Sequence, residues 1–205
     1  MIFNHGKFSE INEAKLVSSI ESLIPVSGSL NFMDFGCGIA SLYEKIDYNK
    51  FVLFDQDKES LRFHKKANYS NVIIISSLDE LIERKIKIDV VMFNSVIQYI
   101  KKDNLIEILR FFVKNFPSIK IVISDIPKHN RFLEMIYLLF TNTRKILTIW
   151  TDIITNIIKK DYKDLDFHTY KIDYFKSMND FKVEIVNNFY LFRTRYTVVV
   201  SRAVN

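Results

Sequence analysis

Short apolar runs alternate with amphipathic segments along the chain up to Pro127. The apolar runs lack strict alternation with polar residues, which is typical of strands buried on both faces of a sheet. They predict strands over residues 30–35, 51–54, 72–75, 90–93 and 119–123. The segments between them are polar on one face and predict helices over residues 39–46, 57–67, 78–84 and 103–116. This repetition of strand and helix favours a parallel sheet with right-handed crossovers.

The pattern differs at the two ends of the chain. Residues 9–23 have apolar positions at helical spacing, with Ser9 as the candidate N-cap. Residues 131–160 are strongly apolar and predict one or two helices. We expect these helices to form a lid on the sheet, and docking on a membrane or on another subunit is the alternative. Residues 181–186 and 196–200 have strand composition with no helix between them, which predicts an antiparallel pair.

Length and composition are those of a globular protein with one domain. The chain has 205 residues, of which 48% are hydrophobic, enough to bury a sizeable core. We expect one domain over residues 1–205, with an N-terminal arm and helix over 1–29 and a helical insertion over 127–170. The net charge of +5 is scattered along the sequence, which does not favour a nucleic acid as partner. No apolar run is long enough to cross a bilayer and no signal peptide is evident, so we expect a cytoplasmic location.

Two glycines follow the first predicted strand, in the sequence Phe-Met-Asp-Phe-Gly-Cys-Gly over residues 32–38. Glycines at such a turn let the backbone approach a ligand closely. A dinucleotide-binding turn would have a third glycine at the position of Ser41. Asp34 precedes the turn, and its carboxylate would repel a pyrophosphate but attract the ammonium and sulfonium charges of S-adenosylmethionine.

This Asp-x-Gly-x-Gly segment resembles motif I of the class I, Rossmann-like S-adenosylmethionine-dependent methyltransferases. The resemblance implies an α/β fold with a mostly parallel seven-stranded sheet, helices on both faces, an antiparallel C-terminal hairpin and a helical lid after the fifth strand. It also implies S-adenosylmethionine as cofactor and S-adenosylhomocysteine as product. The residues that it places under the methionine part of the cofactor are Asp34, Gly36, Cys37 and Gly38.

Candidates for the adenosine part follow the second and third predicted strands. Asp55 ends the second strand, where a carboxylate can accept hydrogen bonds from both ribose hydroxyls. A helix N-cap at Asp55 or Asp57 is the alternative. The resemblance places Gln56 beside the adenine. Many relatives have an aspartate after the third strand for the adenine amino group, whereas this sequence has Ser76, Ser77 and Leu78.

The loop after the fourth predicted strand resembles motif IV of small-molecule methyltransferases. By this resemblance, Asn94 and Ser95 contact the cofactor. Gln98 and Tyr99 would border the substrate site, although ordinary packing is an equal alternative for Tyr99. The loop lacks the two prolines of the enzymes that methylate amino groups in DNA and protein.

A hydroxyl acceptor must lose a proton, so a general base is expected beside the transferred methyl group. Asp125, His129 and His168 are the candidates. The first two follow the fifth strand, where ligands bind in open α/β sheets, but a turn before Pro127 or a solvent-facing loop would also explain them. His64 lies beside two lysines and is predicted to be at the surface. Acidic residues are too few near strands four and five to predict a metal.

The sequence therefore favours a methyltransferase that acts on oxygen in a small molecule or a saccharide intermediate. An RNA methyltransferase is the alternative enzyme. A partner subunit that binds the cofactor without turnover is the alternative outside catalysis, and a nicotinamide reductase is a fourth hypothesis. Neither the methyl acceptor nor the oligomeric state follows from the sequence.

Overall fold

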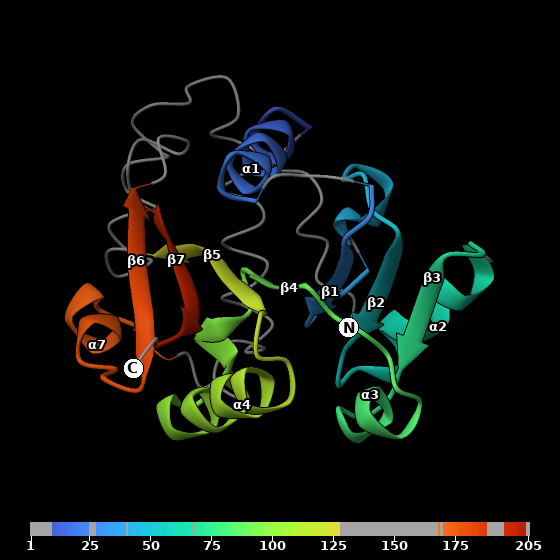
Figure 1. The fold of residues 1–205 in the computed structure, drawn as a ribbon. Coiled ribbons are helices and arrows are strands. Elements are labelled where there is room, and N and C mark those ends of the chain that lie inside the picture. The colour runs from blue at the N-terminus through green and yellow to red at the C-terminus, as the bar shows by residue number, and fades with distance from the viewer. Residues whose placement is uncertain are drawn as a thin grey trace, which may run out of the picture.

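A seven-stranded sheet forms the centre of the protein in a computed structural model (Figure 1). The structure describes residues 10–24, 28–39, 41–67, 69–127, 168, 170–187 and 195–203. The strands lie in the order β3-β2-β1-β4-β5-β7-β6. Their bounds are Asn31–Phe35 (β1), Lys50–Phe54 (β2), Val72–Ile75 (β3), Val90–Asn94 (β4), Lys120–Pro127 (β5), Phe181–Asn187 (β6) and Arg195–Arg202 (β7). The first five are mutually parallel, whereas β7 runs antiparallel to both β5 and β6.

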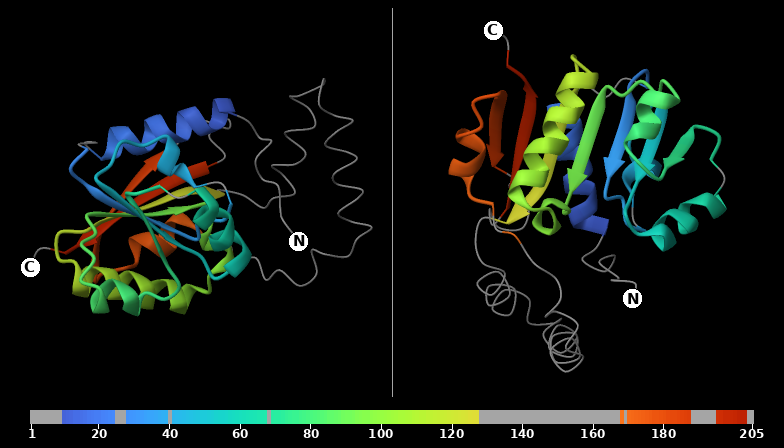
Figure 2. Two further views of the ribbon diagram at one scale, coloured as in Figure 1. Left: turned by 90° about the vertical axis from the view of Figure 1, so that its right-hand side faces the viewer. Right: turned by 90° about the horizontal axis from the view of Figure 1, so that it is seen from below.

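Helices cover both faces of the sheet, with α1 on one face and α4 on the other (Figure 2). The α-helices are Glu10–Leu23 (α1), Lys58–Ala67 (α2), Asp79–Glu83 (α3), Lys102–Asn115 (α4) and Ile172–Lys176 (α7). Two 3-10 turns, Leu42–Glu44 (η2) and Ile97–Tyr99 (η3), follow β1 and β4. Among the helices that the structure describes, none combines the length and the apolar character needed to cross a membrane.

Each face of the sheet has its own hydrophobic core, because residues on both sides of the parallel strands are buried. One core joins the strands to α4, through Leu109 and Phe112, and to α7, through Phe175. The other core joins them to α1 and α2, through Ile20 and Leu61. This two-sided burial is the reason why the strand sequences are continuously apolar rather than alternating.

The predicted fold class is confirmed, including the mostly parallel sheet and the antiparallel C-terminal pair. The helix predicted over residues 39–46 is wrong, because the described residues of this range form only the 3-10 turn Leu42–Glu44. The Asp34 carboxylate accepts a hydrogen bond from the Ser41 hydroxyl and another from the Leu42 amide, and this holds the segment as a turn. The short helix α7 was not predicted. Ser9, the arm over 1–9 and residues 128–167 of the expected insertion lie outside the described residues, so the lid stays a prediction.

The strand order reverses between β1 and β4, which lie side by side at the centre of the sheet. At such a switch point the connections leave in opposite directions, and ligands bind beyond the carboxyl ends of the strands. The carboxyl ends of β1, β2, β4 and β5 meet at this edge. The fold therefore brings the predicted residues after each of these strands to one place.

Candidate functional site

The turn after β1 has two glycines in the left-handed region, with φ of +74° at Gly36 and +53° at Gly38. The Gly36 and Cys37 amides both donate to the Phe54 carbonyl, at 2.8 and 3.1 Å, so the turn is tied to the end of β2. A Cβ at Gly36 would lie 2.3 Å from Cγ2 of Val96. A Cβ at Gly38 would meet no atom within 4 Å, so this part of the turn borders open space. The turn is thus closed on the side of β4 and open at Gly38.

Asp55, directly after β2, is bound to the glycine turn. One oxygen of its half-buried carboxylate accepts the Gly38 N–H at 2.8 Å, and the other accepts the Asp57 N–H at 2.8 Å. Each carboxylate oxygen can accept two hydrogen bonds, so both oxygens keep capacity for another donor. The side chain can therefore hold the turn and still accept hydrogen bonds from a pair of hydroxyls.

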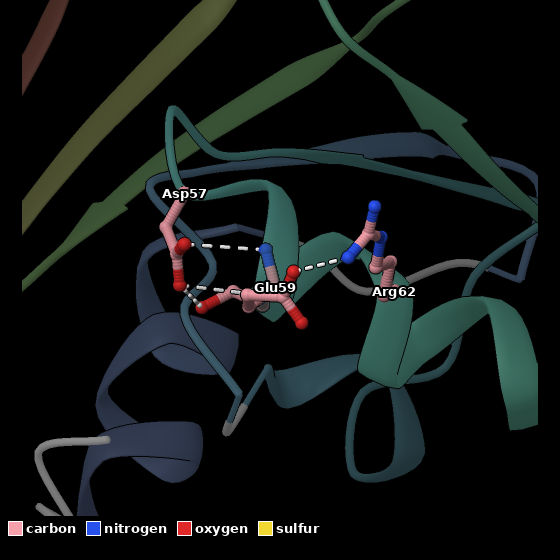
Figure 3. A network of polar contacts seen from close by, with 4 residues as sticks. Asp57, Glu59 and Arg62 are labelled. Carbon is pink, nitrogen blue, oxygen red and sulfur yellow. Dashed lines mark hydrogen bonds and ion pairs between the residues drawn. The ribbon is translucent and has the colours of Figure 1, made fainter. Parts of the chain in front are cut away.

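Asp57, and not Asp55, is the N-cap of α2. Its oxygens accept the amide hydrogens of Glu59 and Ser60, at 3.2 and 3.1 Å, and the Ser60 hydroxyl at 2.7 Å. The Ser60 hydroxyl, followed by the Glu59 amide, lowers the pKa of the Asp57 carboxyl. Glu59 is also paired with Arg62 one turn further along (Figure 3). This exposed ion pair adds little, so the cap is what fixes the start of α2.

Asp34 is the buried acid of the site, with 3% of its surface exposed. Burial, together with the nearby charge of Asp55, raises the pKa of its carboxyl from the ordinary value of 3.8 to about 6. Hydrogen bonds from the Ser41 hydroxyl, at 2.6 Å, and from the Leu42 amide oppose this shift. A cation bound nearby would favour the ionised form of this carboxyl.

Cys37 lies between the two glycines and is buried, with 6% of its surface exposed. Burial, followed by the charges of Asp34 and Asp55, raises the pKa of its thiol. A thiol held in its neutral form is a poor nucleophile, so Cys37 contributes shape and backbone to the turn rather than reactivity.

His64 was predicted to be at the surface, and this is wrong: only 4% of it is exposed. Its Nε2 lies 2.7 Å from the Gly38 carbonyl oxygen and its Nδ1 lies 3.4 Å from the Tyr43 hydroxyl. Ser60 and Leu61 are buried on the same face of α2, at the helical spacing of four and three residues before His64. That spacing is the signal by which the sequence could have placed His64 against the glycine turn.

Ser95 and Asp125 face each other across the ends of β4 and β5. Both have left-handed backbones, with φ of +54° and +61°, and the Ser95 hydroxyl donates to the Asp125 carboxylate. The pairing of β5 with β7 is irregular between Ile123 and Ile126, which turns Asp125 out of the regular ladder. Beside them, the Ser124 hydroxyl donates to the Asn94 side chain at 3.2 Å. Left-handed backbones at residues other than glycine concentrate at functional sites.

Gln98 and His168 meet behind this pair. The Gln98 amide nitrogen donates to the Ser95 carbonyl at 2.6 Å, and the His168 backbone N–H donates to the Gln98 carbonyl at 2.8 Å. Gln98 is 6% exposed, and its side-chain oxygen has no hydrogen-bond partner among the residues that the structure describes. It therefore supports the Ser95 turn from within, whereas Tyr99 is 39% exposed. His129 lies outside the described residues.

No protein-family model matches the sequence, and no curated protein matches it either. Solved structures do. The methyltransferase domain of bacterial CtHen1-C is 10% identical with a TM-score of 0.55, over 94% of this chain and all of that chain (100%). The plantazolicin methyltransferase BpumL in complex with S-adenosylhomocysteine is 14% identical with a TM-score of 0.57, over 94% and 83% of the two chains. The magnesium protoporphyrin IX methyltransferase of Synechocystis PCC 6803, also with S-adenosylhomocysteine, is 14% identical with a TM-score of 0.56, over 94% and 84%.

The chain has the class I methyltransferase fold. At these identities the likeness is one of fold, and it extends over nearly the whole chain. The strand order of this protein, with its switch point between β1 and β4, is part of this shared fold.

Within the methyltransferase fold, the residues after β3 lie next to those after β2, because Ile75 pairs with Phe54 in register. The amide and the hydroxyl of Ser76 both donate to Glu80, at 2.7 and 2.6 Å, and these bonds, with Arg84, lower the pKa of the Glu80 carboxyl to about 2. The Ser76 oxygen keeps its capacity to accept a hydrogen bond. Gln56 and Ser77 are exposed and Leu78 is half-buried. Together with Ser76, these residues stay predicted adenine contacts.

The methyltransferase fold holds no cluster of three or more His, Cys, Asp or Glu side chains suited to a metal ion within the part of the chain that the structure describes. The polar groups at its strand ends are instead paired carboxylates and hydroxyls, such as Asp125 with Ser95. Such a set suits hydrogen bonding and proton transfer.

Proposed function

We propose that the protein is an S-adenosylmethionine-dependent methyltransferase. The observation that carries this proposal is the Asp55 carboxylate, which binds the left-handed Gly38 by its N–H while both its oxygens keep capacity for hydroxyl donors. A ribose presents two adjacent hydroxyls, and the open space at Gly38 leaves room beside them. The methyltransferase fold supports the same assignment, because two of the similar structures contain S-adenosylhomocysteine.

The buried acid separates this cofactor from a nicotinamide dinucleotide. Asp34 lies close enough to Asp55 for their charges to interact, and both are at the glycine turn. The Asp34 carboxylate at that position would repel a pyrophosphate but attract the ammonium and sulfonium groups of S-adenosylmethionine, whereas Asp55 would suit the ribose of either cofactor. The residues present therefore fit the methyl donor better than a dinucleotide.

The cofactor, when bound, supplies an electrophilic methyl group on sulfur, and this chain binds and orients it. In our proposal, Gly36, Cys37 and Gly38 lie under the methionine part and Asp34 supplies charge. Asp55 holds the ribose. The adenine contacts are Gln56, Ser76, Ser77 and Leu78, and Asn94 and Ser95 complete the site after β4.

We further propose that the acceptor is an oxygen of a small molecule or a saccharide intermediate. Asp125 is the candidate base that the structure brings to the strand ends, with His168 and His129 as the alternatives. Its contact with the Ser95 hydroxyl gives a route for orienting the carboxylate. Gln98 and Tyr99 are the proposed border of the acceptor site. RNA is the alternative acceptor, which the net charge of +5 permits.

Calorimetric titration tests the cofactor directly. We expect S-adenosylmethionine and S-adenosylhomocysteine to bind and NAD to bind far more weakly, because only NAD brings a pyrophosphate close to the Asp34 carboxylate. Tight binding of NAD without binding of the other two ligands would overturn the proposal.

The Asp55→Ala variant should lose at least about tenfold to a hundredfold in affinity for S-adenosylhomocysteine, because the loss of even one hydrogen bond to a charged group costs about 1.5–3 kcal/mol. The affinity is measured by calorimetry, and circular dichroism checks that the variant folds. Asp180→Ala is the matched control, since Asp180 is an exposed acid whose partner is Arg110 on the surface. Equal affinities in the two variants would remove Asp55 from the ribose site.

A further inference from the structure

We propose that His64 is a positioning residue, which fixes the cofactor-binding conformation of the glycine turn by holding the Gly38 carbonyl. The inference rests on the proposed function, since the turn matters only if the cofactor binds there. His64 contacts the backbone of the turn from α2, 26 residues further along the chain, and its imidazole is buried.

The contact between His64 and the Gly38 carbonyl is one of several hydrogen bonds that hold Gly38. The Gly38 N–H donates to one oxygen of Asp55, at 2.8 Å, and its carbonyl oxygen lies 2.7 Å from Nε2 of His64. The other oxygen of Asp55 accepts the N–H of Asp57, which begins α2 and leads back to His64. The Gly38 N–H is therefore tied to the connection between β2 and α2, and the Gly38 carbonyl is tied to α2 itself.

The chemistry of the contact fixes where the imidazole carries its proton. A carbonyl oxygen can only accept, so Nε2 must be the donor to Gly38. In the neutral ring, Nδ1 is then the acceptor, and the Tyr43 hydroxyl at 3.4 Å is the group that faces it. The Tyr43 ring packs edge-on against the imidazole, with centroids 5.5 Å apart and planes at 76°. His64 is thus held in one orientation by Tyr43 and presents its donor to the turn.

Glycine is the residue that needs such a restraint most. Gly38 has a left-handed φ of +53° and no Cβ, and unlike Gly36 it has no atom within 4 Å of where a Cβ would lie, so packing does little to restrain the peptide that follows it. A trans peptide directs its carbonyl and the next N–H to opposite sides. When His64 holds the Gly38 carbonyl toward α2, the Ile39 N–H is directed away from α2. His64 therefore selects one of the orientations that glycine alone would leave open.

The test compares three substitutions of His64 that separate the effect of its hydrogen-bond donor from the effect of its side-chain volume. His64→Gln keeps an N–H donor at nearly the distance of Nε2. His64→Leu fills a similar volume without a donor, and His64→Asn places its donor one bond short of the carbonyl. Lys65→Ala is the control, because Lys65 is the neighbouring residue on α2 and is exposed.

Affinity for S-adenosylhomocysteine is measured by calorimetry and thermal stability is measured without ligand. We expect His64→Leu and His64→Asn to bind about fivefold to tenfold more weakly, as the loss of one buried hydrogen bond predicts. His64→Gln should bind within about twofold of the wild type, whatever its melting temperature. If the Leu variant does not fold, the Asn variant carries the comparison with Gln.

Two results would overturn the proposal. Either the Leu and Asn variants bind like the wild type, or the Gln variant loses as much affinity as they do, which would make His64 a packing residue only. Both differ from failure of the proposed function, in which the wild type itself binds neither S-adenosylmethionine nor S-adenosylhomocysteine.

Discussion

The Asp34→Asn variant should be more stable than the wild type at pH 8, by roughly 3 kcal/mol. Burial raises the pKa of Asp34 from 3.8 to about 6, so keeping this carboxyl ionised in the folded protein costs about 1.4 kcal/mol per pKa unit. Asparagine has the same shape and no charge. Its oxygen can accept from the Leu42 amide, while its nitrogen donates to Ser41, whose hydroxyl can reverse its role.

The gain in stability should depend on pH in a defined direction. Between pH 3.8 and about 6 the folded wild type binds more protons at Asp34 than the unfolded chain does. Its stability therefore falls as the pH rises through this window. The advantage of Asp34→Asn should be absent below pH 4 and complete above pH 7. Urea unfolding of both proteins at pH 4 and pH 8 measures it, and an equal difference at the two pH values would contradict the buried charge.

The same substitution should weaken cofactor binding. S-adenosylmethionine carries both an ammonium and a sulfonium charge, whereas S-adenosylhomocysteine carries only the ammonium. Removing a buried carboxylate should therefore reduce affinity for the first ligand by more than for the second, by about tenfold or more for S-adenosylmethionine. Calorimetry with both ligands at pH 8 tests this. A stabilised variant with unchanged affinities would show that Asp34 shapes the turn without contributing its charge.

The Gly36→Ala variant should lose roughly 3 kcal/mol of stability, for two reasons that add. Alanine disfavours the φ of +74° at this residue, and its Cβ would lie 2.3 Å from Cγ2 of Val96. Urea unfolding measures the loss. Gly38→Ala is the matched comparison, because Gly38 has a similar φ of +53° but no atom within 4 Å of the added Cβ. It should lose only about 1 kcal/mol.

Shortening Val96 should rescue part of this loss. Val96→Ala removes the methyl group that the new Cβ would meet, so the double variant Gly36→Ala with Val96→Ala should be more stable than the two single losses predict. A coupling of about 1 kcal/mol or more is expected for residues in direct contact. Additive losses, or a Gly36→Ala variant as stable as Gly38→Ala, would show that the turn moves away from β4 instead.

The sequence predicts the sheet well because the signal is local. Strands buried on both faces must be continuously apolar, and the carboxyl ends of β2 and β3 were predicted correctly to the residue. The end of β5 was not, because the strand continues through an irregular stretch in which Asp125 has a left-handed backbone. Such a stretch depends on pairing with β7, whose residues are some 70 positions away in the sequence.

The candidate site was predictable where the chemistry follows strand ends, as at Asp34 and Asp55. The parts of the site that depend on contacts between different secondary-structure elements could not be predicted. Val96 makes Gly36 necessary, yet nothing in the sequence near either residue indicates their approach. His64 shows the opposite case, because helical spacing alone places it on the buried face of α2. His64 was nevertheless predicted to be at the surface, because two lysines follow it in the sequence.

The position of β7 has a consequence for how the protein assembles. Among the strands that the structure describes, β6 pairs only with β7, which is later in the chain and lies between β6 and β5. While the chain is being synthesised, the strands β1 to β5 can pair in order, but β6 has no neighbour until residues 195–202 emerge. The edge of β5 stays open for the same interval, and an open strand edge invites pairing with other chains. Completion of this half of the sheet is thus a late, long-range folding step.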